Sequence, residues 1–130
     1  MNFSASSQDY LEAILELSNE RGQIRSIDLS SKLGVTRASV NRAIGVLKEL
    51  GYVTQEKYSE ILLTKEGRQA AEAVIIRHKT LKTFLIEVLG VTSEIAQVDA
   101  CKMEHSISIE TLEKLRSFMD KREKKDDKRY

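Results

Sequence analysis

Apolar residues recur at helical spacing along most of the chain, and single glycines separate the runs. The spacing predicts six helices, over residues 7–20, 26–33, 37–50, 66–89, 93–105 and 109–119. Between the third and the fourth, two short segments rich in β-branched and apolar residues, 52–54 and 61–64, flank a polar stretch, which predicts a β-hairpin. The sequence contains no proline, so no helix is interrupted by that residue. The expected fold is therefore mainly α-helical.

The second and third predicted helices are joined by Gly34, which permits a tight turn at positive φ, and Thr36 is placed to cap the third helix. A short helix, a glycine-containing turn and a longer helix, followed directly by a hairpin, form a winged helix-turn-helix. We expect this DNA-binding domain over residues 1–65. A winged helix used for contact with another protein is the alternative interpretation.

The start of the third helix is rich in hydroxyl, amide and guanidinium groups, which suit phosphates and base edges. The expected DNA-binding residues are Thr36, Arg37, Ser39, Asn41 and Arg42, with Lys57 and Tyr58 at the tip of the hairpin. Residues 20–58 hold seven Lys or Arg and four acids, a bias that favours a polyanionic partner. Ordinary solvated charges would give the same bias, so the individual contacts are hypotheses.

The second half of the chain holds both histidines and the single cysteine, and within it residues 91–113 hold five acids against one lysine. Cys101, Glu104 and His105 are spaced i, i+3, i+4, so on one helix they would share a face. The first and fourth predicted helices offer further metal-binding groups in Asp9, Glu12 and His78. Each group alone has an inert interpretation, but a mixed nitrogen, oxygen and sulfur set favours a first-row transition metal over Ca²⁺ or Mg²⁺.

The remaining segments complete the expected organisation. A helical metal-binding and dimerisation domain is expected over residues 66–120, and a charged, flexible tail over 121–130. The apolar seam of the dimerisation domain is expected to comprise Leu112, Leu115, Phe118 and Met119.

Neither a signal peptide nor a bilayer-spanning apolar run is recognisable, and one cysteine suits a reducing compartment, so we expect a cytoplasmic protein with no membrane partner. No catalytic motif is recognisable, so we expect neither an enzyme nor an organic small-molecule substrate.

Three stretches carry a resemblance to a known family: QDYLEAI, LTKEGRQAAEAVIIRHKTL and ACKMEHSIS. Over residues 7–119 the chain resembles the diphtheria-toxin-repressor and manganese-transport-regulator family, in its short form without a carboxy-terminal SH3-like domain. The resemblance implies a homodimeric repressor of iron or manganese homeostasis genes. It also implies that the metal ligands are Asp9, Glu12, His78, Cys101, Glu104 and His105.

The metal is expected to be Fe²⁺, with Mn²⁺ next, and Co²⁺, Ni²⁺ or Zn²⁺ as possible replacements. Manganese-type members have an acid at the position of Cys101, whereas iron-type members have the cysteine but a methionine at the position of Asp9. A thiolate favours the softer ions, while Asp9 and Glu12 favour harder ones. The iron-type ancillary site needs an acid and a second histidine where this chain has Lys82 and Gln97, so we expect that site to be missing.

The resemblance also predicts a mechanism. A metal bound by ligands from both domains would fix the distance between the recognition helices of a dimer, which are the third helices of the two subunits. That distance would be about one DNA turn, roughly 34 Å, or a multiple of it, and the helices would face a near-palindromic operator. A winged-helix regulator that metal does not control, which would bind DNA equally well in chelator, is the main alternative. A small metalloenzyme is the other.

Overall fold

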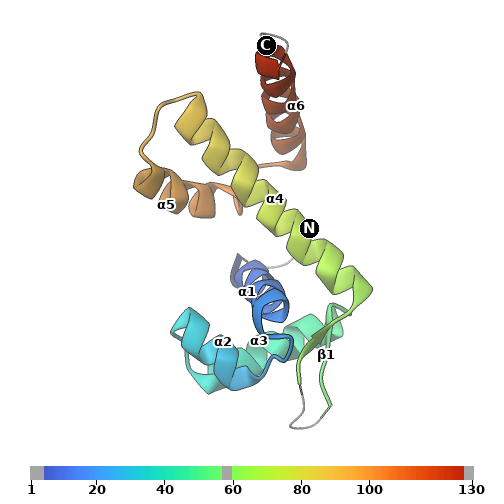
Figure 1. The fold of residues 1–130 in the computed structure, drawn as a ribbon. Helices are drawn as coiled ribbons and strands as arrows, with labels where there is room; N and C mark the ends of the chain where they lie inside the picture. The colour runs from blue at the N-terminus through green and yellow to red at the C-terminus, as the bar shows by residue number, and fades with distance from the viewer. Residues whose placement is uncertain (1–4, 57–59, 128–130) are drawn as a thin grey trace. The chain divides into compact units, whose positions relative to one another are not determined.

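The computed structural model describes residues 5–56 and 60–127, with side chains over 6–56 and 60–124. Its described elements are α1 (Ala5–Arg21), α2 (Ser26–Leu33), α3 (Arg37–Glu49), β1 (Val53–Thr54), β2 (Leu62–Leu63), α4 (Lys65–Glu87), α5 (Ser93–Met103) and α6 (Ile109–Asp127) (Figure 1). They form two compact units, which divide inside α4 between Val74 and Ile75. No helix in the described ranges has the length and apolar character needed to span a bilayer.

The first unit is built around the core of α1, α2 and α3. Leu11 and Ile14 from α1, Leu29 from α2, and Ile44 and Leu47 from α3 are at most 2% exposed. Burying an apolar side chain of this size contributes about 1.5–3 kcal/mol, which holds the three helices together. Most of the periodic apolar positions that predicted these helices therefore form their common core, whereas Ile27 and Leu50 are 54% and 44% exposed.

The turn between α2 and α3 has the predicted helix-turn-helix geometry. Gly34 has φ 65°, and its N–H donates to the Ser30 carbonyl oxygen at 3.0 Å. Glycine reaches this left-handed conformation without a steric penalty. The Thr36 hydroxyl oxygen accepts the Ser39 N–H at 3.1 Å and so caps α3 as expected.

The hairpin is joined firmly to the start of α4. In the antiparallel pair, Val53 faces Leu63 and Thr54 faces Leu62. Thr64 donates its N–H to the Tyr52 carbonyl oxygen at 3.0 Å and its hydroxyl to the Gly51 carbonyl oxygen at 2.7 Å. The same hydroxyl oxygen accepts the Gly67 N–H at 3.0 Å, which caps α4.

The second unit packs the later part of α4 against α5 and α6. Its core contains Leu81 and Leu85 from α4, and Ala96 and Ala100 from α5. The small alanines allow α5 to lie close to α4, which places the end of α5 beside the α4 surface. On α6, Leu115 packs against this core, and Phe118 meets Phe84 edge to face with ring centroids 6.4 Å apart. Part of the expected dimer seam thus serves the unit's own core.

One predicted helix end is wrong, that of the last helix, and the end of α5 changes the setting of two predicted ligands. The helix expected to reach residue 105 ends at Met103, so Glu104 and His105 lie in the turn that follows. The last helix, expected to end near Met119, runs to Asp127, so residues 121–127 of the expected flexible tail are helical. Opposite charges spaced i, i+4, such as Asp120 and Lys124, support an exposed helix, and no glycine or proline interrupts it.

Candidate metal centre and DNA-binding face

The expected DNA-binding residues of α3 lie on its outer side. Val40, Ile44 and Leu47 turn into the core, and the opposite face is open to solvent. That face includes exposed Thr36, Arg37, Asn41 and Arg42 and half-buried Ser39. The arrangement can present hydroxyl, amide and guanidinium groups to a duplex. The other two expected contacts, Lys57 and Tyr58, lie outside the described residues.

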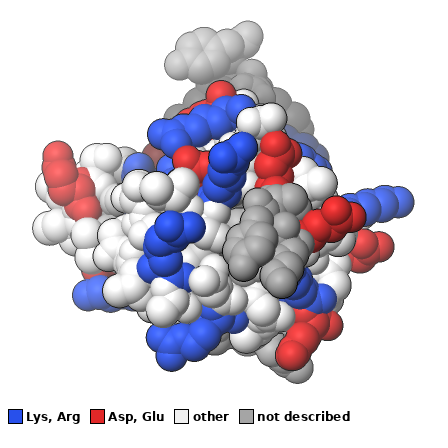
Figure 2. All heavy atoms as spheres, turned by 90° about the horizontal axis from the view of Figure 1, so that it is seen from below, with Lys and Arg blue, Asp and Glu red and all other residues white. Residues whose placement is uncertain are grey.

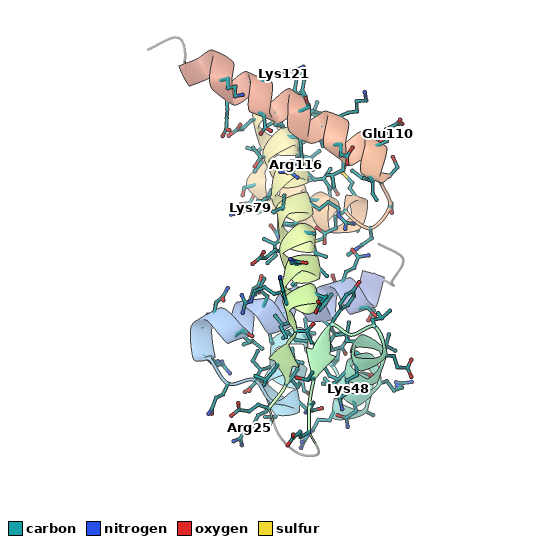
Figure 3. The ribbon with its side chains drawn as sticks, turned by 90° about the vertical axis from the view of Figure 1, so that its right-hand side faces the viewer. Arg25, Lys48, Lys79, Glu110, Arg116 and Lys121 are labelled. Carbon is teal, nitrogen blue, oxygen red and sulfur yellow. The ribbon has the colours of Figure 1, made fainter. Side chains whose placement is uncertain are left out.

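The basic side chains at this end of the first unit are dispersed. Figure 2 shows Lys and Arg spread over the face, with Asp and Glu among and around them. Arg25, just before α2, and Lys48, on α3, project away from the core (Figure 3). Dispersed cations of this kind are better suited to contacting several separate phosphates than to binding one anion at a single site.

A hollow of about 340 Å³ between α1 and α3 adds residues that sequence reasoning missed. It is lined by Ser6, Ser7 and Tyr10 from α1 and by Ser39, Arg42, Ala43 and Val46 from α3. Hydroxyl groups beside a guanidinium suit a phosphate oxygen. In the sequence, only the pair of serines in the first turns of α1 could have indicated these residues. Their proximity to α3 depends on how the helices pack, which the sequence does not show.

In the second unit, α4 and the end of α5 bring together three of the predicted metal ligands. The Nδ1 atom of His78 lies 3.0 Å from Glu104 Oε2 and 3.7 Å from Cys101 Sγ. One ligand atom from each of the three lies within 4.8 Å of the others. Ligands around a tetrahedral ion at about 2.0–2.3 Å lie roughly 3.3–3.8 Å apart, so small side-chain movements would fit one ion. An imidazole, a thiolate and a carboxylate suit a transition metal.

Contacts at the end of α5 hold Glu104 in this position. Its N–H donates to the Ala100 carbonyl oxygen at 3.0 Å, and its own backbone carbonyl oxygen accepts from Arg77 Nη1 at 3.1 Å. Its side chain is 1% exposed, and Oε1 lies 3.4 Å from His105 Nε2. A buried carboxylate needs compensating partners, and the two imidazoles flanking Glu104 are such partners.

Gln97, noted in the sequence only because it stands where the ancillary site needs a histidine, has a definite place here. Its Oε1 lies 3.0 Å from His78 Nε2, on the side of the ring opposite Glu104. Its Nε2 lies 3.9 Å from Cys101 Sγ, one helical turn along α5. Gln97 is therefore a neighbour of two predicted ligands.

The remaining predicted ligands, Asp9 and Glu12, lie one turn apart on α1 in the first unit. Asp9 is exposed and Glu12 is half-buried. Their participation in the metal centre stays a prediction, as does that of His105, which lies beside Glu104.

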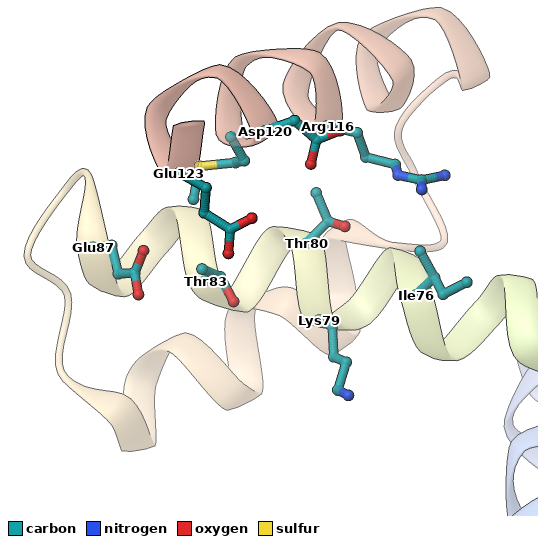
Figure 4. A pocket seen from close by; sticks show the side chains of 9 residues that line it. Ile76, Lys79, Thr80, Thr83, Glu87, Arg116, Asp120 and Glu123 are labelled. Carbon is teal, nitrogen blue, oxygen red and sulfur yellow. The ribbon is translucent and has the colours of Figure 1, made fainter. Parts of the chain in front are cut away.

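A second hollow, of about 270 Å³, lies between α4 and α6 (Figure 4). Lys79 and Arg116 lie toward one end of it, and Glu87 and Glu123 toward the other. Its lining residues include neither histidine nor cysteine, so it lacks the donor set of a transition-metal site.

Comparison with known proteins agrees with this division of roles. Residues 2–61 match the family described as iron dependent repressor, N-terminal DNA binding domain. Residues 64–129 match the one described as iron dependent repressor, metal binding and dimerisation domain. Together the two matches cover nearly the whole chain.

Individual relatives point the same way. An uncharacterized HTH-type transcriptional regulator, MJ0568 of Methanocaldococcus jannaschii, is 40% identical over 91% of this chain and 95% of its own length. The transcriptional regulator MntR of Escherichia coli O6:H1 is 38% identical over 87% of this chain and 72% of its own length.

Among solved structures, the manganese regulator SloR superposes with a TM-score of 0.76 at 28% identity, covering 88% of this chain. The match spans about half, 53%, of that longer chain. The family consists of DNA-binding regulators rather than enzymes. With an exposed recognition helix in one unit and a transition-metal donor set in the other, the chain belongs to the iron-dependent repressor family of metal-dependent transcriptional regulators.

Proposed function

We propose that this protein is a cytoplasmic, homodimeric repressor whose affinity for DNA increases when a divalent transition metal binds. The observation that carries the proposal is the convergence of His78, Cys101 and Glu104 around a space suited to one ion. A thiolate, an imidazole and a carboxylate in this arrangement are the donor types that first-row transition metals accept. The same chain carries a helix-turn-helix with an exposed recognition helix.

The proposed ligands come from both compact units. His78, Cys101, Glu104 and His105 belong to the second unit, and Asp9 and Glu12 belong to the first. A metal bound by both sets would restrict movement of the units relative to each other. Without the metal, the three carboxylates of this set would carry like charges with no cation among them, which disfavours their approach. Metal binding then favours the DNA-competent arrangement to the extent that it binds that arrangement more tightly.

The metal we favour is Fe²⁺, with Mn²⁺ second. Cys101 supplies a soft sulfur ligand, which Mn²⁺ uses less readily than Fe²⁺ does. Asp9 and Glu12 supply the oxygen ligands that both of these ions accept. Co²⁺, Ni²⁺ and Zn²⁺ are expected to bind in vitro, because the donor set suits them as well.

The proposed DNA partner is a near-palindromic duplex in the control region of iron or manganese homeostasis genes. A symmetric dimer places two equal recognition helices on two half-sites, so the operator should have matching symmetry. Arg37, Asn41 and Arg42 on the outer face of α3 are the side chains best suited to meet base edges.

The test begins by selecting duplexes from a random library on the full chain in anaerobic Fe²⁺ and in Mn²⁺. The affinity for the selected duplex is then measured by fluorescence anisotropy with each metal and with chelator. We expect at least tenfold tighter binding with metal, and inverted half-sites in the selected duplex.

His105→Ala should reduce the metal response while leaving the circular dichroism spectrum unchanged. The matched control is Lys102→Ala, an exposed neighbour of Cys101 that is not a proposed ligand. Equal affinity in metal and in chelator would support a winged-helix regulator that metal does not control.

A further inference from the structure

We propose that Gln97 is a positioning residue that keeps the proton of His78 on Nε2, so that the metal binds at Nδ1. This inference rests on the proposed function, because it concerns the same metal centre. It assigns to Gln97 a function other than that of a ligand and specifies one atom of the coordination.

Both ring nitrogens of His78 have defined neighbours. Nε2 lies 3.0 Å from Gln97 Oε1, while Nδ1 lies 3.0 Å from Glu104 Oε2 and 3.7 Å from Cys101 Sγ. A carboxamide oxygen only accepts hydrogen bonds, so the nitrogen that faces it must carry the proton. The carboxylate oxygen 3.0 Å from the other nitrogen also only accepts, so that nitrogen can carry a proton too until a metal ion replaces it; with the Nε2 proton retained, its lone pair is then the one available to the metal. That nitrogen, Nδ1, is the one beside the carboxylate and the sulfur.

The orientation of the Gln97 amide is supported by its second neighbour. With Oε1 toward His78, the amide nitrogen lies 3.9 Å from Cys101 Sγ, where it can donate a weak hydrogen bond. A metal-bound thiolate accepts hydrogen bonds but has none to donate, so the reversed amide would place an oxygen against a negatively charged sulfur. Gln97 and Cys101 are spaced i, i+4 on α5, which keeps them on one face of the helix.

The partial burial of the His78 ring limits hydrogen bonding of its nitrogens to water. The side chain of His78 is 13% exposed, so water has restricted access to its nitrogens. In metalloproteins, the partner of the second nitrogen of a ligating histidine orients the ring, and its loss typically lowers metal affinity about 10–100-fold. Gln97 meets this description through its acceptor oxygen.

The first measurement is the protonation pattern of the histidine rings in the full-length, Zn²⁺-loaded protein, obtained from long-range ¹H–¹⁵N correlation spectra. The chain has only two histidines, which keeps the spectra simple. We expect His78 to carry its proton on Nε2 and the metal on Nδ1. A proton on Nδ1 would overturn the inference, and would leave the metal-dependent function intact.

The second measurement is the Zn²⁺ affinity of Gln97 variants by competition with a chelating dye. Gln97→Leu removes the acceptor and should lower the affinity about 10–100-fold. Gln97→Glu keeps an acceptor oxygen opposite Nε2 and should stay within a few-fold of the wild type, with the Nε2 proton retained. Glu94→Leu, an exposed substitution on the same helix, is the control and should leave the affinity unchanged.

Unchanged affinity and an unchanged His78 proton in Gln97→Leu would show that Gln97 does not position the ring. An equal loss in Gln97→Leu and Gln97→Glu would also contradict the acceptor function. If the wild-type chain binds no divalent metal, the proposed function fails together with this inference.

Discussion

Two glycines of the first unit should respond in opposite directions to the same substitution. Gly45 lies in the middle of α3, and Gly67 lies in the first turn of α4. Replacement by alanine adds one methyl group at each position and reduces the freedom of the unfolded chain in both cases. The surroundings of that methyl group therefore decide the sign of the change in the free energy of unfolding.

At Gly45 the new methyl group would meet no heavy atom within 4 Å. Alanine is favoured over glycine inside a helix by about 0.8–1.0 kcal/mol. Gly45→Ala should therefore raise the free energy of unfolding by about 1 kcal/mol. Gly45 also lies on the exposed face of α3 with Asn41 and Arg42, so a loss of DNA affinity in this more stable variant would indicate close approach of the duplex there.

At Gly67 the new methyl group would overlap the carbonyl group of Tyr52. That carbonyl cannot easily move, because it accepts the Thr64 N–H at 3.0 Å and the Tyr52 N–H donates to Leu47 at 2.9 Å. Forced overpacking costs about 1–3 kcal/mol, and loss of the Thr64 hydrogen bond adds about 1 kcal/mol. After subtracting the helix-propensity gain of about 1 kcal/mol, we expect Gly67→Ala to lose about 1–3 kcal/mol.

The assay is urea denaturation followed by tyrosine fluorescence, with circular dichroism in parallel. The two described tyrosines, Tyr10 and Tyr52, both belong to the first unit, so their fluorescence reports on that unit. Differences in midpoint at equal slope give the change in stability. A Gly67→Ala variant as stable as the wild type, or a Gly45→Ala variant less stable than the wild type, would contradict the packing described at these glycines.

Three further predictions concern the core, the DNA-binding face and the metal centre. Leu81→Ala should destabilise the second unit by about 2–5 kcal/mol in thermal denaturation, because this core side chain is 1% exposed; a loss under 1 kcal/mol would contradict the packing. Arg42→Ala should weaken DNA binding and, if Arg42 contacts a phosphate, lower the slope of log affinity against log salt by about 0.9; unchanged affinity would remove Arg42 from the interface. Glu104→Gln should lower the Mn²⁺ affinity, measured by titration calorimetry, at least tenfold, whereas Glu113→Gln, an exposed control, should not. Equal Mn²⁺ affinities of Glu104→Gln and the wild type would exclude Glu104 as a ligand.

The helix-turn-helix was predictable because its determinants are local. Apolar spacing, Gly34 in the turn and Thr36 as the cap are all visible within a few residues of one another. The end of α5 was not predictable in the same way. The turn at Glu104 is held by Arg77, which is 27 residues away in the sequence. No local pattern reveals such a contact.

The metal centre was predictable in its residue types but not in its full arrangement. A cysteine, acids and histidines in an acidic segment indicated a transition metal, and the helical spacing grouped Cys101 with Glu104. The approach of His78 depends on how α4 packs against α5 through Ala96 and Ala100. The contact between Gln97 and His78 depends on the same packing. From the sequence, Gln97 was notable only because it stands where the ancillary site needs a histidine.

The most direct test of the coupling between metal and DNA is the Mn²⁺ or Fe²⁺ dissociation constant, measured anaerobically with and without the selected duplex. Coupling is reciprocal, so DNA must tighten metal binding by the same factor by which metal tightens DNA binding. We predict a decrease of at least tenfold in the metal dissociation constant when the duplex is bound. An identical constant with and without DNA would contradict the account.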